Sequence, residues 1–293
     1  MGSAMVSRLL DRGCDLSIYN RTREKAEPFG ARGARIVDSP ADLADRDLVF
    51  TSVSRSEDLA DVVTGPHGLL SRGGRGPGII VDTSTVSMDV TAEVARHAAP
   101  FGTALLAAPV SGNPKVVQAG RLTIAASGPA AAFETALPYL RLLAPSVTYV
   151  GEGARARLVK ICHNLLLDVF TQALAETTVL AERGGIARAD YLAFINGSVM
   201  GSTFSRYKTP AFVNLDFTPT MTGRLMRKDL ELGLEVGRQL NVPLPVTALT
   251  HQIVVSLIGQ GLGDVDFGAL LELEARSANF ELVPDDRLVS DGL

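Results

Sequence analysis

Hydrophobic and polar positions alternate in two different ways along the chain, and the change falls near residue 151. Before it, short runs rich in β-branched residues alternate with helical stretches. The runs predict strands at residues 16–19, 35–37, 48–53, 79–82, 105–107, 122–125 and 147–150, and the stretches between them predict helices at 41–46, 57–63, 89–99 and 130–142. Strands that alternate with helices are typical of βαβ units around a buried parallel sheet, which binds ligands at the carboxyl ends of its strands.

The strand signals stop after Gly151-Glu152-Gly153. A nearly breaker-free segment follows at 154–184, further helices are predicted at 189–195, 225–240, 246–259 and 267–275, and a polar tail at 278–293 is expected to pack loosely. The pattern therefore predicts an α/β domain over residues 1–151 and an all-α domain over residues 152–293.

The segment 154–184 would form a helix of about 45 Å, which is longer than a small domain needs. It carries apolar residues on two faces: Leu158, Ile161, Leu165 and Val169 on one, and Leu166, Phe170 and Leu174 on the other. One small domain does not cover both faces, and an exposed apolar stripe of this size marks an interface. We expect a homodimer or homotetramer that is held together by the helical half.

Composition and charge narrow the class of protein. Hydrophobic residues make up 46% of the chain, charged residues 20%, and the net charge is −4, which favours a globular protein over a nucleic-acid binder. The apolar runs near Leu165 and Val254 are interrupted before the roughly 20 residues that span a bilayer, so no membrane segment is expected. Two distant cysteines and four scattered histidines indicate neither a disulfide framework nor a metal site. These features, with no signal-peptide pattern at the start, favour a cytoplasmic location.

The first residues differ from the start of a complete dinucleotide-binding unit. Such a unit opens with a strand and a G-x-G-x-x-G turn before its first helix, whereas here only Gly2 stands where the last of the three glycines would be. We therefore expect an N-terminally truncated Rossmann-type domain that binds NADPH weakly, and whose binding about a dozen upstream residues would restore. The alternatives are an incomplete sequence and a real loss of cofactor binding.

A second cofactor signal lies at the end of the predicted strand 16–19. Dinucleotide folds place an acidic residue there for the ribose 2′-hydroxyl or an arginine for a 2′-phosphate, and Asn20-Arg21-Thr22 supplies Arg21. The guanidinium fork suits a phosphate and favours NADP, with NAD still possible. In the alternative interpretation, Thr22 N-caps the next helix and Arg21 is solvated. Val53 and Ser54, at the end of another strand, are further candidates for cofactor binding.

Four short motifs follow one another along the chain. Two of them lie at the ends of predicted strands: Val81-Asp82-Thr83-Ser84-Thr85-Val86 and Ala108-Pro109-Val110-Ser111-Gly112-Asn113. The third opens the long helix and reads Lys160-Ile161-Cys162-His163-Asn164. The fourth lies in a later helix and reads Met226-Arg227-Lys228-Asp229-Leu230. Together they resemble the β-hydroxyacid dehydrogenase family, which includes 3-hydroxyisobutyrate dehydrogenase and tartronate semialdehyde reductase, over residues 1–273. The resemblance implies a Rossmann domain and a helical domain like that of 6-phosphogluconate dehydrogenase. It also implies NAD(P)-dependent hydride transfer to or from a short β-hydroxy carboxylate or its semialdehyde.

Two groups of residues make chemical sense in that reaction. Lys160 and Asn164 are four residues apart and share one helix face, where the ammonium can exchange the hydroxyl proton and the amide can hold the substrate. Ser111-Gly112-Asn113 joins a glycine that admits a ligand closely to two neutral donors for a carboxylate. Without the resemblance, Lys160 is typical of a solvated charge, and the second group fits a plain turn as well as a carboxylate site.

The resemblance assigns three further residues. It implies that Thr85 lies near the nicotinamide and the substrate, that Lys228 contacts the cofactor and that Asp229 is the partner of Lys228 in the site. Taken alone, Thr85 is typical of a helix cap, and Lys228 and Asp229 are typical of an exposed pair on a helix.

Three positions depart from the family pattern. His163 stands where the family usually has a first asparagine, and it can either relay a proton at the edge of the pocket or pack within the helix layer. Asp168 replaces a small or apolar residue and lies about two turns from Lys160, too far for direct pairing. Met221 replaces an aromatic. An imine reductase-like enzyme and a non-catalytic cofactor-binding or interaction protein remain as alternatives; Lys160 argues against the first.

Overall fold

The computed structural model describes residues 1–292. Contacts between Cα atoms divide the chain into two compact units, Met1–Lys160 and Ile161–Leu293, and the boundary falls inside the long helix α7 (Arg155–Arg183). The first contains every strand of the described residues, and the second contains helices only.

The first unit is built on parallel strands. β1 (Ser17–Ile18) pairs with β2 (Arg35–Ile36), and β3 (Leu48–Thr51), β4 (Ile79–Asp82) and β5 (Ala104–Ala107) form a second parallel sheet. β6 (Val110–Ser111) is antiparallel to β7 (Thr123–Ala126), which is parallel to β8 (Ser146–Tyr149). Among residues 1–292, no ladder joins β1 to β3, and a complete Rossmann sheet has one further strand at that position.

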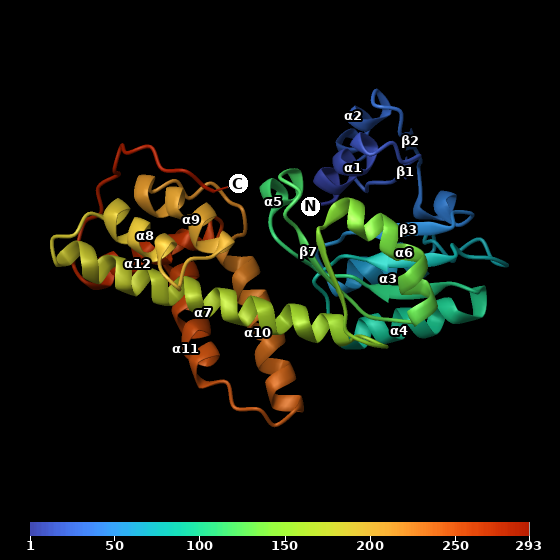
Figure 1. Ribbon diagram of the computed structural model, residues 1–293. Coiled ribbons are helices and arrows are strands. Elements are labelled where there is room, and N and C mark those ends of the chain that lie inside the picture. Colours follow the sequence, from blue (N-terminus) through green and yellow to red (C-terminus); the bar gives the residue numbers. More distant parts are fainter. Residues whose placement is uncertain (293) are drawn as a thin grey trace. The chain divides into compact units, whose positions relative to one another are not determined.

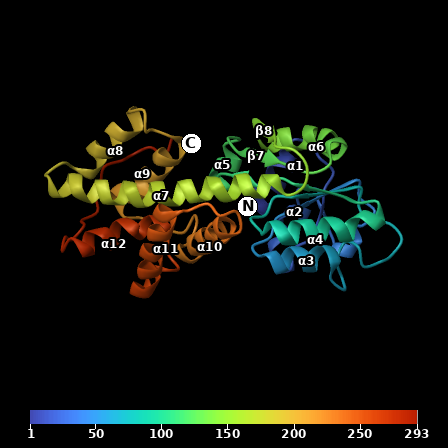
Figure 2. The same cartoon turned by 90° about the horizontal axis from the view of Figure 1, so that it is seen from below.

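Helices flank the strands of this unit. In both ribbon views α3 (Ser56–Thr64) and α4 (Met88–Ala98) lie on one side of β3–β5, and α6 (Ala130–Leu143) lies on the other (Figures 1 and 2). The remaining helices are α1 (Gly2–Asp11), α2 (Glu27–Gly30) and α5 (Pro114–Gln118), with 3₁₀ turns at Arg23–Lys25, Pro40–Leu43 and Ala99–Phe101. All four residues of β4 are buried, which explains why its apolar run shows no alternation.

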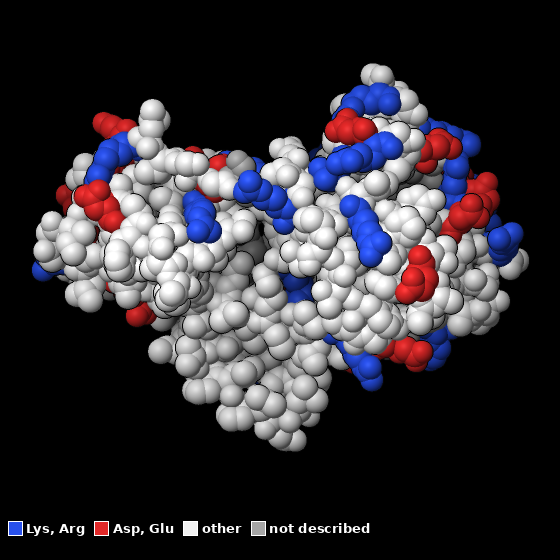
Figure 3. Space-filling model, viewed as in Figure 1, with Lys and Arg blue, Asp and Glu red and all other residues white. Residues whose placement is uncertain are grey.

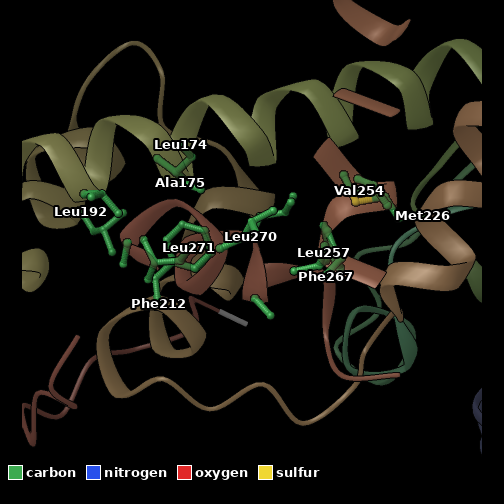
Figure 4. Packing of buried hydrophobic residues seen from close by; sticks show 14 of the residues in the cluster. Leu174, Ala175, Leu192, Phe212, Met226, Val254, Leu257, Phe267, Leu270 and Leu271 are labelled. Atoms are coloured by element: carbon green, nitrogen blue, oxygen red, sulfur yellow. The ribbon is translucent and has the colours of Figure 1, made fainter. Parts of the chain in front are cut away.

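The second unit is a helical bundle around the later turns of α7. It contains α8 (Arg188–Gly197), α9 (Thr203–Asn214), α10 (Gly223–Gln239), α11 (Pro245–Leu257) and α12 (Leu270–Ser277), with a π-turn at Ile258–Leu262 and a 3₁₀ turn at Phe267–Ala269. Both ribbon views place α8 and α11 on opposite sides of α7 (Figures 1 and 2). Their inward faces form one apolar core, which includes Leu174, Phe212, Met226, Leu257 and Leu270 (Figure 4).

The predicted fold class is confirmed: a Rossmann-like unit precedes an all-helical one. The helix predicted at 41–46 is wrong, because the chain forms only the 3₁₀ turn Pro40–Leu43, closed by a capping box between Ser39 and Asp42. Thr22 occupies an N-cap position, but its side chain makes no cap hydrogen bond.

Three elements escaped the sequence analysis. β6 has two residues and α5 has five, and both are too short for a periodic pattern. α9 contains Pro210 and few apolar positions; its start is marked by a capping box of Ser202 and Ser205.

The tail after α12 has no regular structure but is tied to the helical unit. The backbone N–H of Asp285 donates to the carbonyl of Val213 at 3.0 Å, and the buried Arg188 donates to the carbonyls of Val213 and Val283. These bonds anchor the tail at a few points, while Val283, Leu288 and most of its other side chains stay exposed, as loose packing predicts.

Helix α7 agrees closely with the helix predicted at 154–184, but it contains a longer apolar stretch than expected. By length and composition alone it could cross a membrane, with a mean hydropathy of 1.2 over its most apolar 18 residues, of which 39% are buried inside the protein. Core helices of water-soluble proteins pass the same test. By this criterion, the expectation that no apolar run is long enough to span a bilayer is wrong.

Candidate functional site

The carboxyl ends of β3 and β4 bring two predicted segments together. Thr51 lies opposite Asp82 in the register of these strands. Two residues after Asp82, the Ser84 hydroxyl donates to the Asp82 carboxylate at 2.6 Å and accepts from the backbone N–H of Val53 at 2.9 Å. This hydroxyl fixes Val53 beside the loop that carries Thr85, at the edge where parallel sheets bind ligands.

The first turn of α1 lies against the same edge. A Cβ atom added to Gly2 would stand 3.8 Å from the Cβ of Ser52, so Gly2 adjoins the segment of Val53 and Ser54. No side chain caps the N-terminus of α1. Backbone N–H groups at such a helix start attract phosphate. These residues fit the last part of a dinucleotide cradle.

The structure places the β1 end at the surface. The Asn20 amide donates to the Thr22 carbonyl at 2.7 Å, which shapes the turn, and the Arg21 side chain is 86% exposed. The Arg21 guanidinium also donates to Asp58 at 3.3 Å. An exposed guanidinium with one long contact stays accessible to a phosphate, but Asp58 brings a competing negative charge.

Ser111-Gly112-Asn113 forms a strained turn between β6 and α5. Gly112 has a φ of +133°, and an added Cβ would stand 2.6 Å from Cγ1 of Val116, so only glycine fits. The side-chain oxygen of Asn113 accepts from the N–H of Val116 at 3.0 Å and caps α5. Its buried Nδ2 has no hydrogen-bond partner within residues 1–292, so a donor is left for a ligand atom such as a carboxylate oxygen.

Lys160 and Asn164 project from one face of α7, one turn apart. Nδ2 of the buried Asn164 donates to Oδ2 of Asp229 at 2.6 Å. Asp229, on α10, is 5% exposed, and its other oxygen lies 3.3 Å from the Lys228 ammonium. The structure thus joins three of the predicted residues, Asn164, Lys228 and Asp229, in one network. The alternative interpretation expected Asp229 to be exposed on its helix, whereas the structure buries it.

Asn164 also has protein partners on both sides of its amide. Its amide nitrogen is committed to Asp229, and its oxygen lies 3.0 Å from Nδ1 of His163. Asn164 is therefore held by protein groups on both sides, and protonated Nδ1 of His163 would be the donor in the second contact.

His163 lies at the edge of a cavity within the helical unit. The cavity has a volume of about 360 Å³ and is lined chiefly by apolar side chains of α7 and of the segment 200–204, with Ser202 among them. Asp168 is fully buried. Among residues 1–292 no cluster of His, Cys, Asp and Glu could hold a metal ion.

Sequence reasoning missed Arg157, and it included Asp82 in a motif without finding its partner. Both are almost completely buried, and they form an ion pair at the start of α7. Burial of an arginine leaves no periodic signal in one sequence.

The chain has a Rossmann-like unit with hydrogen-bond donors at the ends of β3, β4 and β6, and a helical unit follows it. This combination is typical of an oxidoreductase that binds a nicotinamide dinucleotide. Residues 1–151 match the NAD binding domain of 6-phosphogluconate dehydrogenase, and residues 154–273 match the NAD-binding domain of NADP-dependent 3-hydroxyisobutyrate dehydrogenase. The chain belongs to the β-hydroxyacid dehydrogenase family.

Relatives agree with this membership. The chain is 33% identical to 2-(hydroxymethyl)glutarate dehydrogenase of Eubacterium barkeri, over 93% of this chain and 91% of the relative. It is 27% identical to glyoxylate/succinic semialdehyde reductase 2 of Arabidopsis thaliana, over 93% and 76%. The crystal structure of 3-hydroxyisobutyrate dehydrogenase from Salmonella typhimurium is similar with a TM-score of 0.83 and 25% identity, over 93% of this chain and 95% of that one. The predicted resemblance and the predicted class of enzyme, an NAD(P)-dependent oxidoreductase that acts on a CH–OH group, are confirmed.

Proposed function

We propose that this enzyme interconverts a short β-hydroxy carboxylate and its semialdehyde, with NADP preferred over NAD and Lys160 as the acid/base residue. The observation that supports this most is the arrangement on α7. Lys160 stands one turn before an asparagine whose amide is held from two sides, by Asp229 and by His163. A fixed amide one helical turn from the ammonium is what a proton transfer to one defined oxygen requires.

The bound cofactor supplies the hydride or accepts it. During reduction, the Lys160 ammonium gives a proton to the carbonyl oxygen as that oxygen gains charge. During oxidation, the neutral amine takes the hydroxyl proton. Asn164 holds the geometry of this face, because Asp229 fixes the plane of its amide.

Ser111, Gly112 and Asn113 bind the substrate carboxylate in this proposal. The unpartnered Nδ2 of Asn113 and the close approach permitted at Gly112 support the assignment. The relatives' names also point to carboxylates: 2-(hydroxymethyl)glutarate, glyoxylate and succinic semialdehyde each carry at least one. Thr85 then contacts the nicotinamide and the substrate.

On the cofactor side, Gly2, Val53 and Ser54 take the phosphates in this proposal. Asn20, Arg21 and Thr22 surround the ribose, and the exposed Arg21 guanidinium accepts the 2′-phosphate of NADP. Lys228 contacts the cofactor from α10 and is anchored there by its pair with Asp229.

The experiment is a screen of the full chain with hydroxyisobutyrate, serine, threonate, glycerate and succinic semialdehyde, each with NADP(H) and NAD(H). The proposal expects turnover of at least one carboxylate and a higher kcat/KM with NADP(H). Turnover of cyclic imines in place of every carboxylate would favour an imine reductase; the imine reductase of a Pseudomonas species shares the fold at 20% identity. Absence of turnover would favour a non-catalytic protein. The human cytokine-like nuclear factor N-PAC, 30% identical over 92% of this chain and 49% of its own length, contains a related domain.

We also propose that the protein is a cytoplasmic homodimer or homotetramer. Support comes from large apolar side chains exposed on the helical unit, at Leu166 and Leu180 of α7, Phe194 of α8, and Val246 and Leu249 of α11. Figure 3 shows almost no charged side chain over the α10–α11 hairpin on the face in view. The burial of Asp168 and Gln172 within α7 supports a core helix rather than a membrane span, since lipid would not satisfy these groups.

A further inference from the structure

Arg157, three residues before Lys160, is a fully buried cation at the start of α7. Its side chain is 1% exposed and that of its partner Asp82 is 0% exposed. A buried guanidinium is strongly unfavourable unless charge and hydrogen bonds compensate it. Such a group persists only where its surroundings are built around it.

The three nitrogens of the Arg157 guanidinium contact three different segments. Nη2 donates to Oδ2 of Asp82, the last residue of β4. Nη1 donates to the carbonyl oxygen of Ser84, and Nε donates to the hydroxyl of Thr91 in α4 at 3.0 Å. Because the guanidinium is a rigid planar fork, these contacts fix both the position and the orientation of the first turn of α7.

The Asp82 carboxylate extends the network to β3. Its Oδ1 accepts from the Thr51 hydroxyl at 2.6 Å and from the Ser84 hydroxyl at 2.6 Å. The Ser84 hydroxyl in turn accepts from the backbone N–H of Val53. One connected set of bonds therefore holds the Val53 segment, the peptide between Ser84 and Thr85, and the helix turn that leads to Lys160.

A structural role alone does not explain this arrangement. Replacing a buried ion pair by apolar side chains of similar volume is often neutral or stabilising, so the pair adds little net stability. What it adds is fixed geometry. The groups that it fixes are the neighbours of the proposed acid/base, nicotinamide and phosphate contacts.

We propose that Arg157 is a positioning residue for hydride transfer: it sets Thr85 and Val53 at the strand ends against the helix turn that carries Lys160. This assignment rests on the proposed dehydrogenase function. Displacement of reacting groups by about 1 Å can lower a rate roughly 100-fold, so loss of the fork is expected to slow the chemical step itself.

The test compares Arg157→Lys with Arg155→Lys in the full chain. Lys keeps a positive charge for Asp82 but cannot reach three acceptors in a plane. Arg155, two residues earlier, is exposed and serves as the matched control. The measurement is the first-order rate constant of NADPH oxidation in a single turnover with enzyme in excess, together with the NADPH Kd. When folded enzyme saturates NADPH, unfolding of part of the protein leaves this rate constant unchanged, because only the folded complex reacts.

We expect Arg157→Lys to lower the rate constant roughly tenfold or more, with the NADPH Kd within about threefold of wild type and no change for Arg155→Lys. Thr91→Val removes the acceptor of Nε together with the bond from the Thr91 hydroxyl to the Ser87 carbonyl. It gives a milder decrease and covers the case in which Arg157→Lys does not fold. An unchanged rate constant in either folded variant overturns the proposal. A wild-type chain without turnover overturns the proposed function, and this assignment with it; an active wild type beside unchanged variants overturns this assignment alone.

Discussion

Replacing Asp229 by Asn should impair catalysis far more than its distance from the reacting atoms suggests. Asp229→Asn conserves shape and removes one negative charge from a side chain that is 5% exposed. The carboxylate accepts the amide of Asn164 at 2.6 Å and lies 3.3 Å from the Lys228 ammonium. A hydrogen bond to a charged group contributes about 1.5–3 kcal/mol. Since about 1.4 kcal/mol corresponds to a tenfold change, kcat/KM should fall roughly 10- to 150-fold.

The assay is steady-state kinetics with the best carboxylate substrate, and Glu231→Gln is the matched control. Glu231 lies two residues further along α10, is exposed and loses the same charge. We expect its kcat/KM to stay near that of the wild type. If Asp229→Asn also stays within twofold of wild type, the orientation of Asn164 does not depend on Asp229 and the reasoning is wrong.

A swapped variant separates packing from chemistry. Asn164→Asp combined with Asp229→Asn restores a donor–acceptor pair between α7 and α10, so thermal stability should recover relative to Asp229→Asn. Activity should not recover, because the carboxylate now stands one turn from Lys160. Recovery of full activity would show that the pair acts through packing alone.

Three further predictions follow from named contacts. Arg21→Asp should shift the ratio of kcat/KM values from NADP toward NAD, because a carboxylate repels the 2′-phosphate; an unchanged ratio removes Arg21 from the cofactor site. Burial raises the pKa of Asp266, but the ammonium of Lys208 and the hydrogen bonds from Thr220 lower it more, so that the pKa lies below its usual range. The free energy of unfolding should therefore decrease as the pH drops below about 4. Protonation of Asp266 removes its ion pair with Lys208. The urea midpoint should therefore fall less in Lys208→Met than in wild type between about pH 6 and about pH 3, a range that spans the usual Asp pKa. An equal decrease of the midpoint in both proteins would refute this. Finally, sedimentation at micromolar concentration should give a mass at least twice the 31.0 kDa of the chain. Leu166→Asp should shift this mass toward the monomer, whereas the control Leu288→Asp, in the tail, should leave it unchanged. A monomeric wild type contradicts the proposed assembly.

The sequence predicted the elements whose pattern is long and periodic. β4, α4 and the helices after residue 154 other than α9 were located within a few residues, because their burial follows a regular period. The shorter elements β6 and α5 were missed, although the motif that they frame, Ser111-Gly112-Asn113, was recognised. Motif and period are different signals, and here the motif was the stronger one.

The candidate site was predicted as a set of residues but not as a network. Helix spacing was enough to place Lys160 and Asn164 on one face. It could not show that the Asn164 amide is turned to Asp229, since that contact spans 65 residues of sequence. The buried pair of Arg157 and Asp82 lies at 75 residues separation and was invisible for the same reason.

The central claim, that Lys160 exchanges the hydroxyl proton, is tested most directly by amine rescue of Lys160→Ala. The account predicts that kcat/KM falls about 10²- to 10⁴-fold while the NADPH Kd changes little. Small alkylamines added to the solution should then restore part of the rate, and the restored rate should depend on the pKa of the amine. A Lys160→Ala variant that keeps wild-type kcat/KM, or one that loses activity and gains nothing from any amine, would contradict the assignment of Lys160 as the acid/base residue.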